Sequence, residues 1–140
     1  STGNANVLDV QNSSGTSLFF VSGSGELGLN QSISSIQTAT VTTATTSATT
    51  LMTVSSTIFR TAEFVVQGSD STGLKYSVAK VHAVHNGTNT YTTEYGGVNA
   101  GGSTGTLSVT DPSGGNILLQ VTPASTNSTV WKVTAILTKA

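Results

Sequence analysis

The feature that most constrains this chain is the pair Asn86-Gly87, which stands between two runs of alternating apolar residues within residues 59–95. Asn-Gly between such runs is the strongest short-range signal of a β-hairpin, because both residues accept the positive φ of a type I′ turn. The sequence therefore predicts an antiparallel hairpin that turns at His85-Asn86-Gly87-Thr88, and an all-β domain around it.

The composition favours strands over helices in the rest of the chain. Charged residues make up only 8% of the sequence, against about 25% in ordinary globular domains, and Thr, Ser, Gly and Asn take their place. Thr and Ser either lose side-chain freedom in a helix or compete for its backbone hydrogen bonds, whereas Thr fits a pleated sheet. We therefore expect a hydroxyl-rich β structure.

Charge and hydropathy exclude several classes of partner. The formal net charge is -1 and there is no basic cluster, so we expect no nucleic-acid binding and no attraction to anionic lipids. No apolar run approaches the length of about 18 residues that crosses a bilayer, so we expect no membrane insertion. The sequence contains no Cys, which excludes disulfides and thiolate metal sites.

Residues 1–50 predict a short-strand attachment or stalk segment. Three apolar stretches, at residues 7–10, 18–21 and 26–29, are separated by turns rich in Ser, Gly and Asn. Strands this short cannot bury their apolar faces by themselves, so they need the downstream domain or copies of the same segment as a partner. Residues 31–50 are rich in Thr, Ser and Ala without Gly or Pro. We interpret them as an extended strand or stalk, with a flexible linker as the alternative.

Residues 51–140 predict a compact antiparallel head. Strands are expected at residues 59–67, 74–85, 91–95, 106–110, 117–122 and 129–138, with a glycine-rich loop at residues 96–102 and turns between the others. Trp131 alternates with polar residues and is assigned to the core. Regular short strands joined by antiparallel turns are typical of a β-sandwich or a jelly-roll-like barrel.

The sequence shows no catalytic, metal or cofactor motif, so we expect a protein that is not an enzyme. His82 and His85 are three residues apart on an expected strand, which sends their side chains to opposite faces, and each is assigned to the surface or an interface. The acids Glu63, Glu94 and Asp111 fall on separate elements, without the pairing that glycoside hydrolysis needs.

The alternative function is carbohydrate binding. Tyr91 and Tyr95 share one face of the expected strand, and Asn99 lies in the glycine-rich loop that follows. Aromatic faces together with a few polar groups are typical of ligand sites, so these three residues are the candidate glycan contacts.

Two parts of the chain resemble structural proteins of tailed bacteriophages. Residues 8–15 (LDVQNSSG) and 20–27 (FVSGSGEL) resemble the short β repeat of phage tail fibres, in which a Ser-Gly turn alternates with a Phe-x-Val strand. Residues 47–51 (SATTL), 59–64 (FRTAEF), 84–88 (VHNGT) and 93–96 (TEYG) resemble the C-terminal domain of virion structural proteins, especially those of cyanophages.

The resemblance implies a homotrimeric tail fibre, spike or capsid-decorating appendage on the virion surface. It implies attachment to other virion proteins through the N-terminal segment and a role in host attachment, with a host-surface glycan as a further partner, and it carries over no functional side chain. Three copies closing around one axis would cover the unpartnered apolar strands. The expected trimer interface consists of Val7, Leu8, Val10, Leu18, Phe19, Phe20, Leu27 and Leu29.

Overall fold

The computed structural model describes residues 6–31, 33–111 and 115–140. These residues form eleven strands, and among them there is no helix long and apolar enough to cross a membrane. The prediction of an all-β fold with antiparallel sheets is confirmed, since every strand pair is antiparallel.

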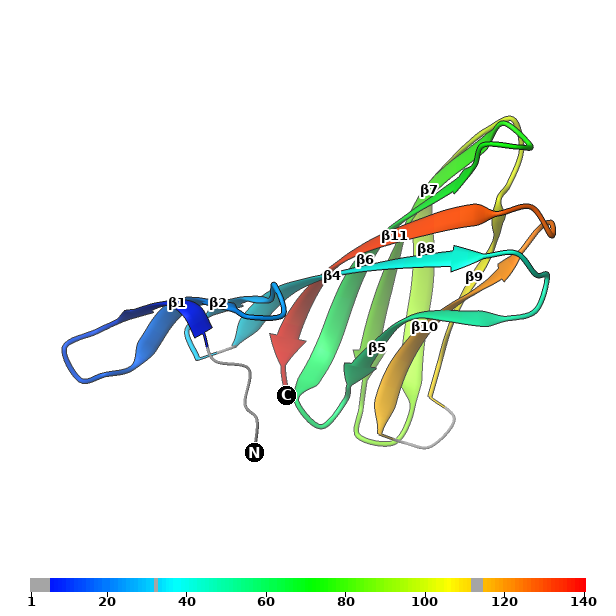
Figure 1. The fold of residues 1–140 in the computed structure, drawn as a ribbon. Coiled ribbons are helices and arrows are strands. Elements are labelled where there is room, and N and C mark those ends of the chain that lie inside the picture. Colours follow the sequence, from blue (N-terminus) through cyan, green and yellow to red (C-terminus); the bar gives the residue numbers. More distant parts are fainter. Residues whose placement is uncertain (1–5, 32, 112–114) are drawn as a thin grey trace.

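The strands form two sheets (Figure 1). The large sheet has eight strands in the order β1 (Asn6–Gln11), β2 (Ser17–Ser22), β3 (Leu27–Leu29), β4 (Ser34–Thr43), β11 (Thr129–Lys139), β6 (Phe59–Asp70), β7 (Lys75–His85) and β8 (Thr90–Ala100). The small sheet has three strands in the order β5 (Thr49–Ser55), β10 (Asn116–Pro123) and β9 (Gly105–Thr110).

The core lies between the small sheet and the strands of the large sheet that follow β3. Along β11 the side chains alternate, so that Trp131, Val133, Ala135 and Leu137 are buried while the residues between them are exposed or half-buried. These side chains pack with apolar residues of β5, β6, β7 and β10 in one cluster. Burying alternate residues of two facing sheets makes a β-sandwich, as predicted.

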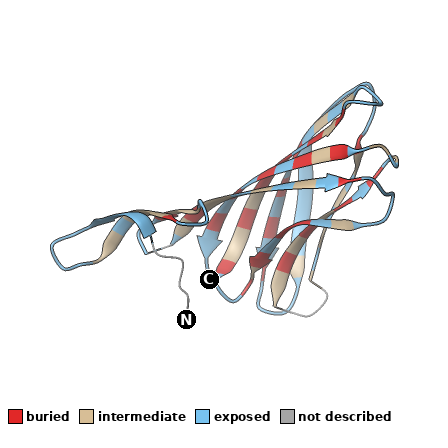
Figure 2. Cartoon of the chain, viewed as in Figure 1, coloured by how far each residue is buried: buried red, intermediate tan, exposed pale blue. Residues whose placement is uncertain are grey.

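The first three strands project from the sandwich as a single layer (Figure 1), which we call the arm (residues 6–29). Within the described residues no second sheet covers the arm, and most of the arm's residues are exposed or half-buried (Figure 2). The expected strands at residues 7–10, 18–21 and 26–29 are therefore present as β1, β2 and β3.

The Thr-rich stretch after the arm is built into the sandwich. Strand β4 pairs with β11 along its whole length, from Ser34 opposite Thr138 to Thr43 opposite Thr129. The extended interpretation is thus right for residues 34–43, and the flexible-linker alternative is wrong for them. That residues 1–50 and 51–140 behave as separate domains stays a prediction.

The hairpin between β7 and β8 is where the sequence placed it, but its turn differs. The last strand pair is His85 with Thr90, which leaves a four-residue loop. A type I′ turn is wrong, because only Gly87 has a positive φ (104°) while Asn86 does not. The Asn86 side chain accepts the N–H groups of Thr88 and Asn89 instead, which holds Asn86 in an ordinary conformation.

Strand β8 also extends further than the sequence predicted. It runs to Ala100, through the residues expected to form a glycine-rich loop. Between Val78 and Lys80 of β7 the pairing shifts, so that one extra residue of β8 is accommodated around Gly96 and Gly97. This irregularity is a β-bulge, in which glycine takes the positive φ (63° at Gly96) that other residues avoid.

Candidate functional site

The face of the large sheet that is turned away from the small sheet carries a groove, and we call this face the outer face. Directly opposite residues of antiparallel strands lie on the same face. Glu63, His82 and Thr93 stand opposite one another across β6, β7 and β8, and they alternate with buried core residues such as Ala62 and Ala83. All three lie on the outer face.

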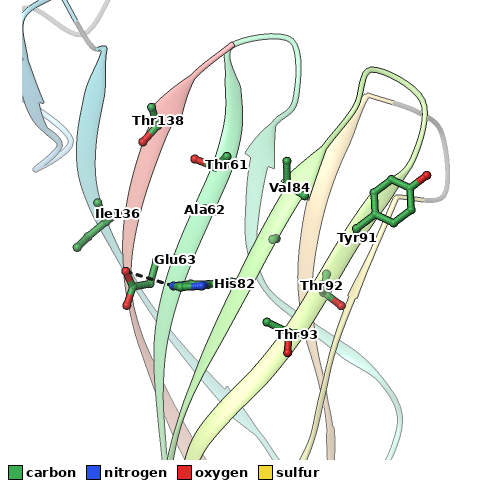
Figure 3. Close-up of a pocket in the computed structure, with 11 residues that line it drawn as sticks. Thr61, Ala62, Glu63, His82, Val84, Tyr91, Thr92, Thr93, Ile136 and Thr138 are labelled. Atoms are coloured by element: carbon green, nitrogen blue, oxygen red, sulfur yellow. Dashed lines mark ion pairs between the residues drawn. The ribbon is translucent and has the colours of Figure 1, made fainter.

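The groove has a volume of about 520 Å³ and combines apolar and polar walls (Figure 3). Ile136 of β11, Val84 of β7 and Tyr91 of β8 supply exposed apolar surface. Glu63, His82 and Thr93 supply polar groups between them. A groove with aromatic and aliphatic walls and few polar groups is the usual form of a binding site.

A hydrogen-bonded cluster surrounds the Glu63 carboxylate. Lys80 Nζ lies 3.2 Å from Glu63 Oε1, and His82 Nε2 lies 3.4 Å from Glu63 Oε2. The Tyr95 hydroxyl donates to Glu63 Oε1 at 3.3 Å and lies 2.8 Å from His82 Nε2. The rings of His82 and Tyr95 meet edge to face, with centroids 4.9 Å apart.

The cluster fixes the charge state of two of its members. The hydrogen bond from Lys80 lowers the pKa of Glu63 below its ordinary value, although partial desolvation opposes this. Desolvation and then the Glu63 charge raise the pKa of Tyr95. At neutral pH the site therefore presents a carboxylate and a protonated phenol, which can accept and donate hydrogen bonds to a hydroxyl-rich ligand.

The groove holds one carboxylate rather than a pair. Glu94 stands opposite Val81, whose side chain is in the core, so Glu94 is on the other face of β8. In the part of the chain that the structure describes, no group of three or more His, Cys, Asp or Glu residues could hold a metal ion. The arrangement is suited to hydrogen bonding and aromatic contact.

Two of the three candidate glycan contacts lie on the outer face, and one of them, Tyr91, lines the groove. Tyr91 and Tyr95 stand opposite Val84 and Lys80 on the outer face. Asn99 stands opposite Ser77 and lines a separate cavity of about 70 Å³ together with Glu94 and Thr104. The extra residue at the Gly96-Gly97 bulge reverses the alternation of β8 and sends Asn99 to the opposite face.

The expected trimer-interface residues divide between the two faces of the arm. Phe20 stands opposite Asp9 and Gly28, and its ring occupies the space that a side chain at position 28 would need. Leu18, two residues earlier, is on the same face as Phe20. Val7 lies at a register shift of β1. The remaining five share the outer face: Leu8, Val10, Phe19, Leu27 and Leu29.

Two of these five residues, Leu8 and Leu27, belong to a row of apolar side chains that leads to the groove. Cross-strand pairing aligns Leu8 with Val21, Val21 with Leu27, Leu27 with Ile36, and Ile36 with Ile136. We call Leu8, Val21, Leu27, Ile36 and Ile136 the apolar row. It crosses five strands of the outer face and ends at Ile136, which lines the groove.

A second titratable cluster lies at the β7–β8 loop. The His85 side chain is only 1% exposed, and its Nε2 lies 2.5 Å from Asp111 Oδ2, on a side chain that is 3% exposed. The assignment of His85 to the surface or an interface is therefore wrong. Nothing in the spacing of the sequence indicated this pair, because the two residues are 26 positions apart and meet only through the fold.

Comparison with known proteins identifies no family for this chain. No protein-family model matches the chain, and no curated protein matches it. Among solved structures, it is similar to the tailspike protein of the Acinetobacter phage vB_ApiP_P1, with 12% sequence identity and a TM-score of 0.43. The similarity covers 75% of this chain and 22% of the tailspike chain, so this chain spans about a fifth of that protein.

Proposed function

We propose that this protein is a non-catalytic structural component of a phage surface appendage, and that it assembles as a homotrimer through its arm. The observation that carries the proposal is the exposure of the arm's apolar side chains in the single chain: Val7, Leu8, Val10, Leu18 and Leu29 are between 44% and 74% exposed. The resemblance of residues 8–15 and 20–27 to fibre repeats supports the same conclusion.

The free energy of burying apolar side chains favours the association of several copies through the outer face of the arm. Burying one aliphatic side chain of this size stabilises a complex by about 1.5 to 3 kcal/mol. The outer face of the arm offers four aliphatic residues and Phe19, each already partly covered in the single chain, so their further burial offsets part of an association cost of about 4 to 15 kcal/mol. Closure around an axis also covers the free edge of β1, which would otherwise pair with other strands.

The mass of the particle in solution tests this assembly. Native mass spectrometry of the full chain should give three times the 14.1 kDa of one copy. Leu8→Asp combined with Leu29→Asp places two charges on the outer face of the arm and should give a monomer with a folded sandwich. Ser13→Asp adds a charge in an exposed turn of the arm and should leave the trimer intact.

A different outcome would refute the trimer. If the unmodified chain stays monomeric at micromolar concentration while the amides of β1 and β2 are protected from hydrogen exchange, the arm is stable without copies of itself. The proposed assembly would then be wrong.

A second function is favoured by the position of Tyr91 and Tyr95 beside the groove. We infer that the groove binds a surface glycan, with Tyr91 as an aromatic contact and Glu63 as the acceptor of ligand hydroxyls. Glycan-array binding should be lost in Tyr91→Ala and retained in Tyr76→Ala, a matched exposed tyrosine that does not line the groove. If the Tyr91→Ala variant binds glycans as well as the Tyr76→Ala variant does, the groove is not the binding site.

A further inference from the structure

The loop between β7 and β8 contains an exposed Asn-Gly pair, Asn86-Gly87, beside the buried His85. In such a pair the backbone nitrogen of Gly87 can attack the side-chain carbon Cγ of Asn86, which closes a five-membered succinimide ring and releases ammonia. The reaction is slow in ordinary chains because an amide nitrogen is a weak nucleophile and an amide is a poor leaving group. Both obstacles fall when a base, an oxyanion site and a proton donor are in place.

The base is provided by His85. The Gly87 N–H donates to His85 Nδ1 at 3.0 Å. Because a backbone N–H can only donate, Nδ1 must be unprotonated, and the ring proton is therefore on Nε2, facing Asp111. The imidazole lone pair is aimed at the proton that Gly87 must lose.

Asp111 holds this imidazole in place. Its Oδ2 lies 2.5 Å from His85 Nε2, and its Oδ1 accepts the N–H groups of Gly115 and Asn116 at 3.1 and 3.4 Å. A buried carboxylate that fixes the tautomer of a histidine and stabilises its protonated form is the arrangement that activates nucleophiles in hydrolases. Asp111 is thus a positioning residue for His85.

The oxygen of the Asn86 amide lies in a site that stabilises negative charge. Asn86 Oδ1 accepts the N–H of Thr88 at 2.9 Å and the N–H of Asn89 at 2.8 Å. When the Gly87 nitrogen adds to Cγ, this oxygen becomes an oxyanion, and the same two donors are already directed at it.

The leaving nitrogen also has a neighbour. Asn86 Nδ2 lies 3.5 Å from the Tyr91 hydroxyl. In the unreacted amide Nδ2 is the donor to this hydroxyl. Once addition to Cγ turns Nδ2 into an amine, the hydroxyl can pass it a proton and recover one from solvent, since both residues are exposed.

We propose that Asn86-Gly87 is a self-modification site, at which the folded protein converts Asn86 to a succinimide and then to aspartate or isoaspartate. The Gly87 N–Asn86 Cγ bond forms as the Gly87 proton moves to His85 Nδ1. The oxyanion then collapses to the carbonyl as the Cγ–Nδ2 bond breaks, the departing nitrogen takes a proton from the Tyr91 hydroxyl and leaves as ammonia, and the proton held by His85 is released to solvent, which restores the one lost by Tyr91. Water opens the ring at either carbonyl, and no oxidant or reductant is required.

The product changes the surface next to the groove. Hydrolysis adds a carboxylate to a loop that is neutral in the sequence, and the isoaspartate product also lengthens the main chain by one carbon. Because Tyr91 lines the groove, the modification alters the charge and the shape at that end of the outer face.

The rate of ammonia loss in the folded protein tests the proposal. The full chain is incubated at neutral pH, folded in buffer or unfolded in urea, and Asn86 is followed by peptide mapping with mass spectrometry. The folded chain should react faster by about 100-fold, the low end of what a positioned general base contributes. Asn99 and Asn127 serve as internal controls. A folded rate equal to or below the unfolded rate would show that the hydrogen bond to His85 protects the loop, and the proposal would be wrong.

Three variants separate chemistry from folding. His85→Gln and Asp111→Asn, each checked by thermal melting, should reduce the folded rate to that of the unfolded chain. Asp111→Glu keeps the carboxylate and should recover part of the rate, which a purely structural role of Asp111 would not require. Folded variants of His85 and Asp111 that react as fast as the original chain would overturn the assignment.

Discussion

At the scale of single residues, Gly68 shows how tightly the sandwich is packed. A Cβ at this position would contact Thr104 Oγ1 and would lie 2.6 Å from Trp131 Cζ3. Gly68→Ala should therefore reduce the free energy of unfolding by about 1 to 3 kcal/mol. Gly97→Ala is the control, because nothing lies within 4 Å of its added Cβ. If Gly68→Ala and Gly97→Ala lose the same free energy of unfolding in urea, tight packing at Gly68 is not the cause.

Asp70 gives a second prediction, about acid stability. Its carboxylate accepts the N–H of Gly73 at 2.7 Å and the side-chain amide of Asn127 at 2.9 Å. These bonds, the first above all, lower the pKa of Asp70 in the folded state. A lowered pKa means that the unfolded chain binds the proton more tightly. The stabilisation is thus present above the ordinary aspartate pKa of about 3.9 and is lost as the pH falls through the folded value.

Thermal melts at neutral pH and near pH 3 measure this effect. Asp70→Asn should lower the melting temperature at neutral pH and should reduce the further drop in acid. Asp9→Asn, in the exposed β1 strand, should reproduce the original pH dependence. If the melting temperature of Asp70→Asn falls in acid as much as that of the original chain, then other carboxylates control the acid sensitivity.

The residues of the candidate site were only partly predictable. Tyr91 and Tyr95 share a face because they are separated by an even number of positions within one strand, and the sequence shows that directly. Glu63 and Lys80 meet Tyr95 only through the register of three strands. The burial of His85 depends in the same way on a loop far along the chain. Contacts across strands carry no local signal, so the polar cluster and the His85–Asp111 pair were missed.

At the scale of elements, the alternation of apolar and polar residues predicted the strands well. The turn-forming residues predicted the ends of the strands less well. The expected strand at residues 129–138 matches β11 closely because Trp131, Val133, Ala135 and Leu137 recur at every second position, as the core-facing residues of a strand do. The end of β8 was missed because Gly96 and Gly97 suggest a loop, whereas here they form a bulge inside a continuing strand. Glycine allows both outcomes, and only the neighbouring strand decides between them.

Strand β4 supplies a prediction about how the Thr-rich segment is held. The buried indole nitrogen of Trp131 donates to Thr43 Oγ1 at 2.9 Å. Thr43→Val keeps the volume but leaves this N–H without an acceptor, which should cost about 1 to 3 kcal/mol in urea unfolding. Thr42→Val, at the exposed neighbouring position, should change stability by less than about 0.5 kcal/mol. Similar values for the two variants would show that the hydrogen bond does not hold β4.

At the scale of the whole molecule, the arm and the sandwich are joined by little pairing. Strand β3 contacts β4 through only a short ladder, from Leu27 opposite Ile36 to Leu29 opposite Ser34. Removing residues 1–31 should therefore leave a folded, monomeric sandwich. Removing residues 1–48 also takes away β4 and uncovers Trp131, so this shorter chain should not fold cooperatively.

Circular dichroism and thermal melting of the two truncated chains measure the difference. The melting temperature after removal of residues 1–31 should lie within a few degrees of that of the full chain. A folded chain that lacks residues 1–48 would place the boundary near residue 50, as the sequence alone suggested.

The strand order has a consequence for the synthesis of the protein. Strand β11 lies between β4 and β6 in the large sheet, so neither of these strands has its central neighbour until residues 129–139 have left the ribosome. The sandwich therefore closes only once β11 has been made, in one step that joins distant segments. Until then, the edges of β4 and β6 that face β11 stay open, so neighbouring nascent chains on one messenger RNA expose these edges to one another.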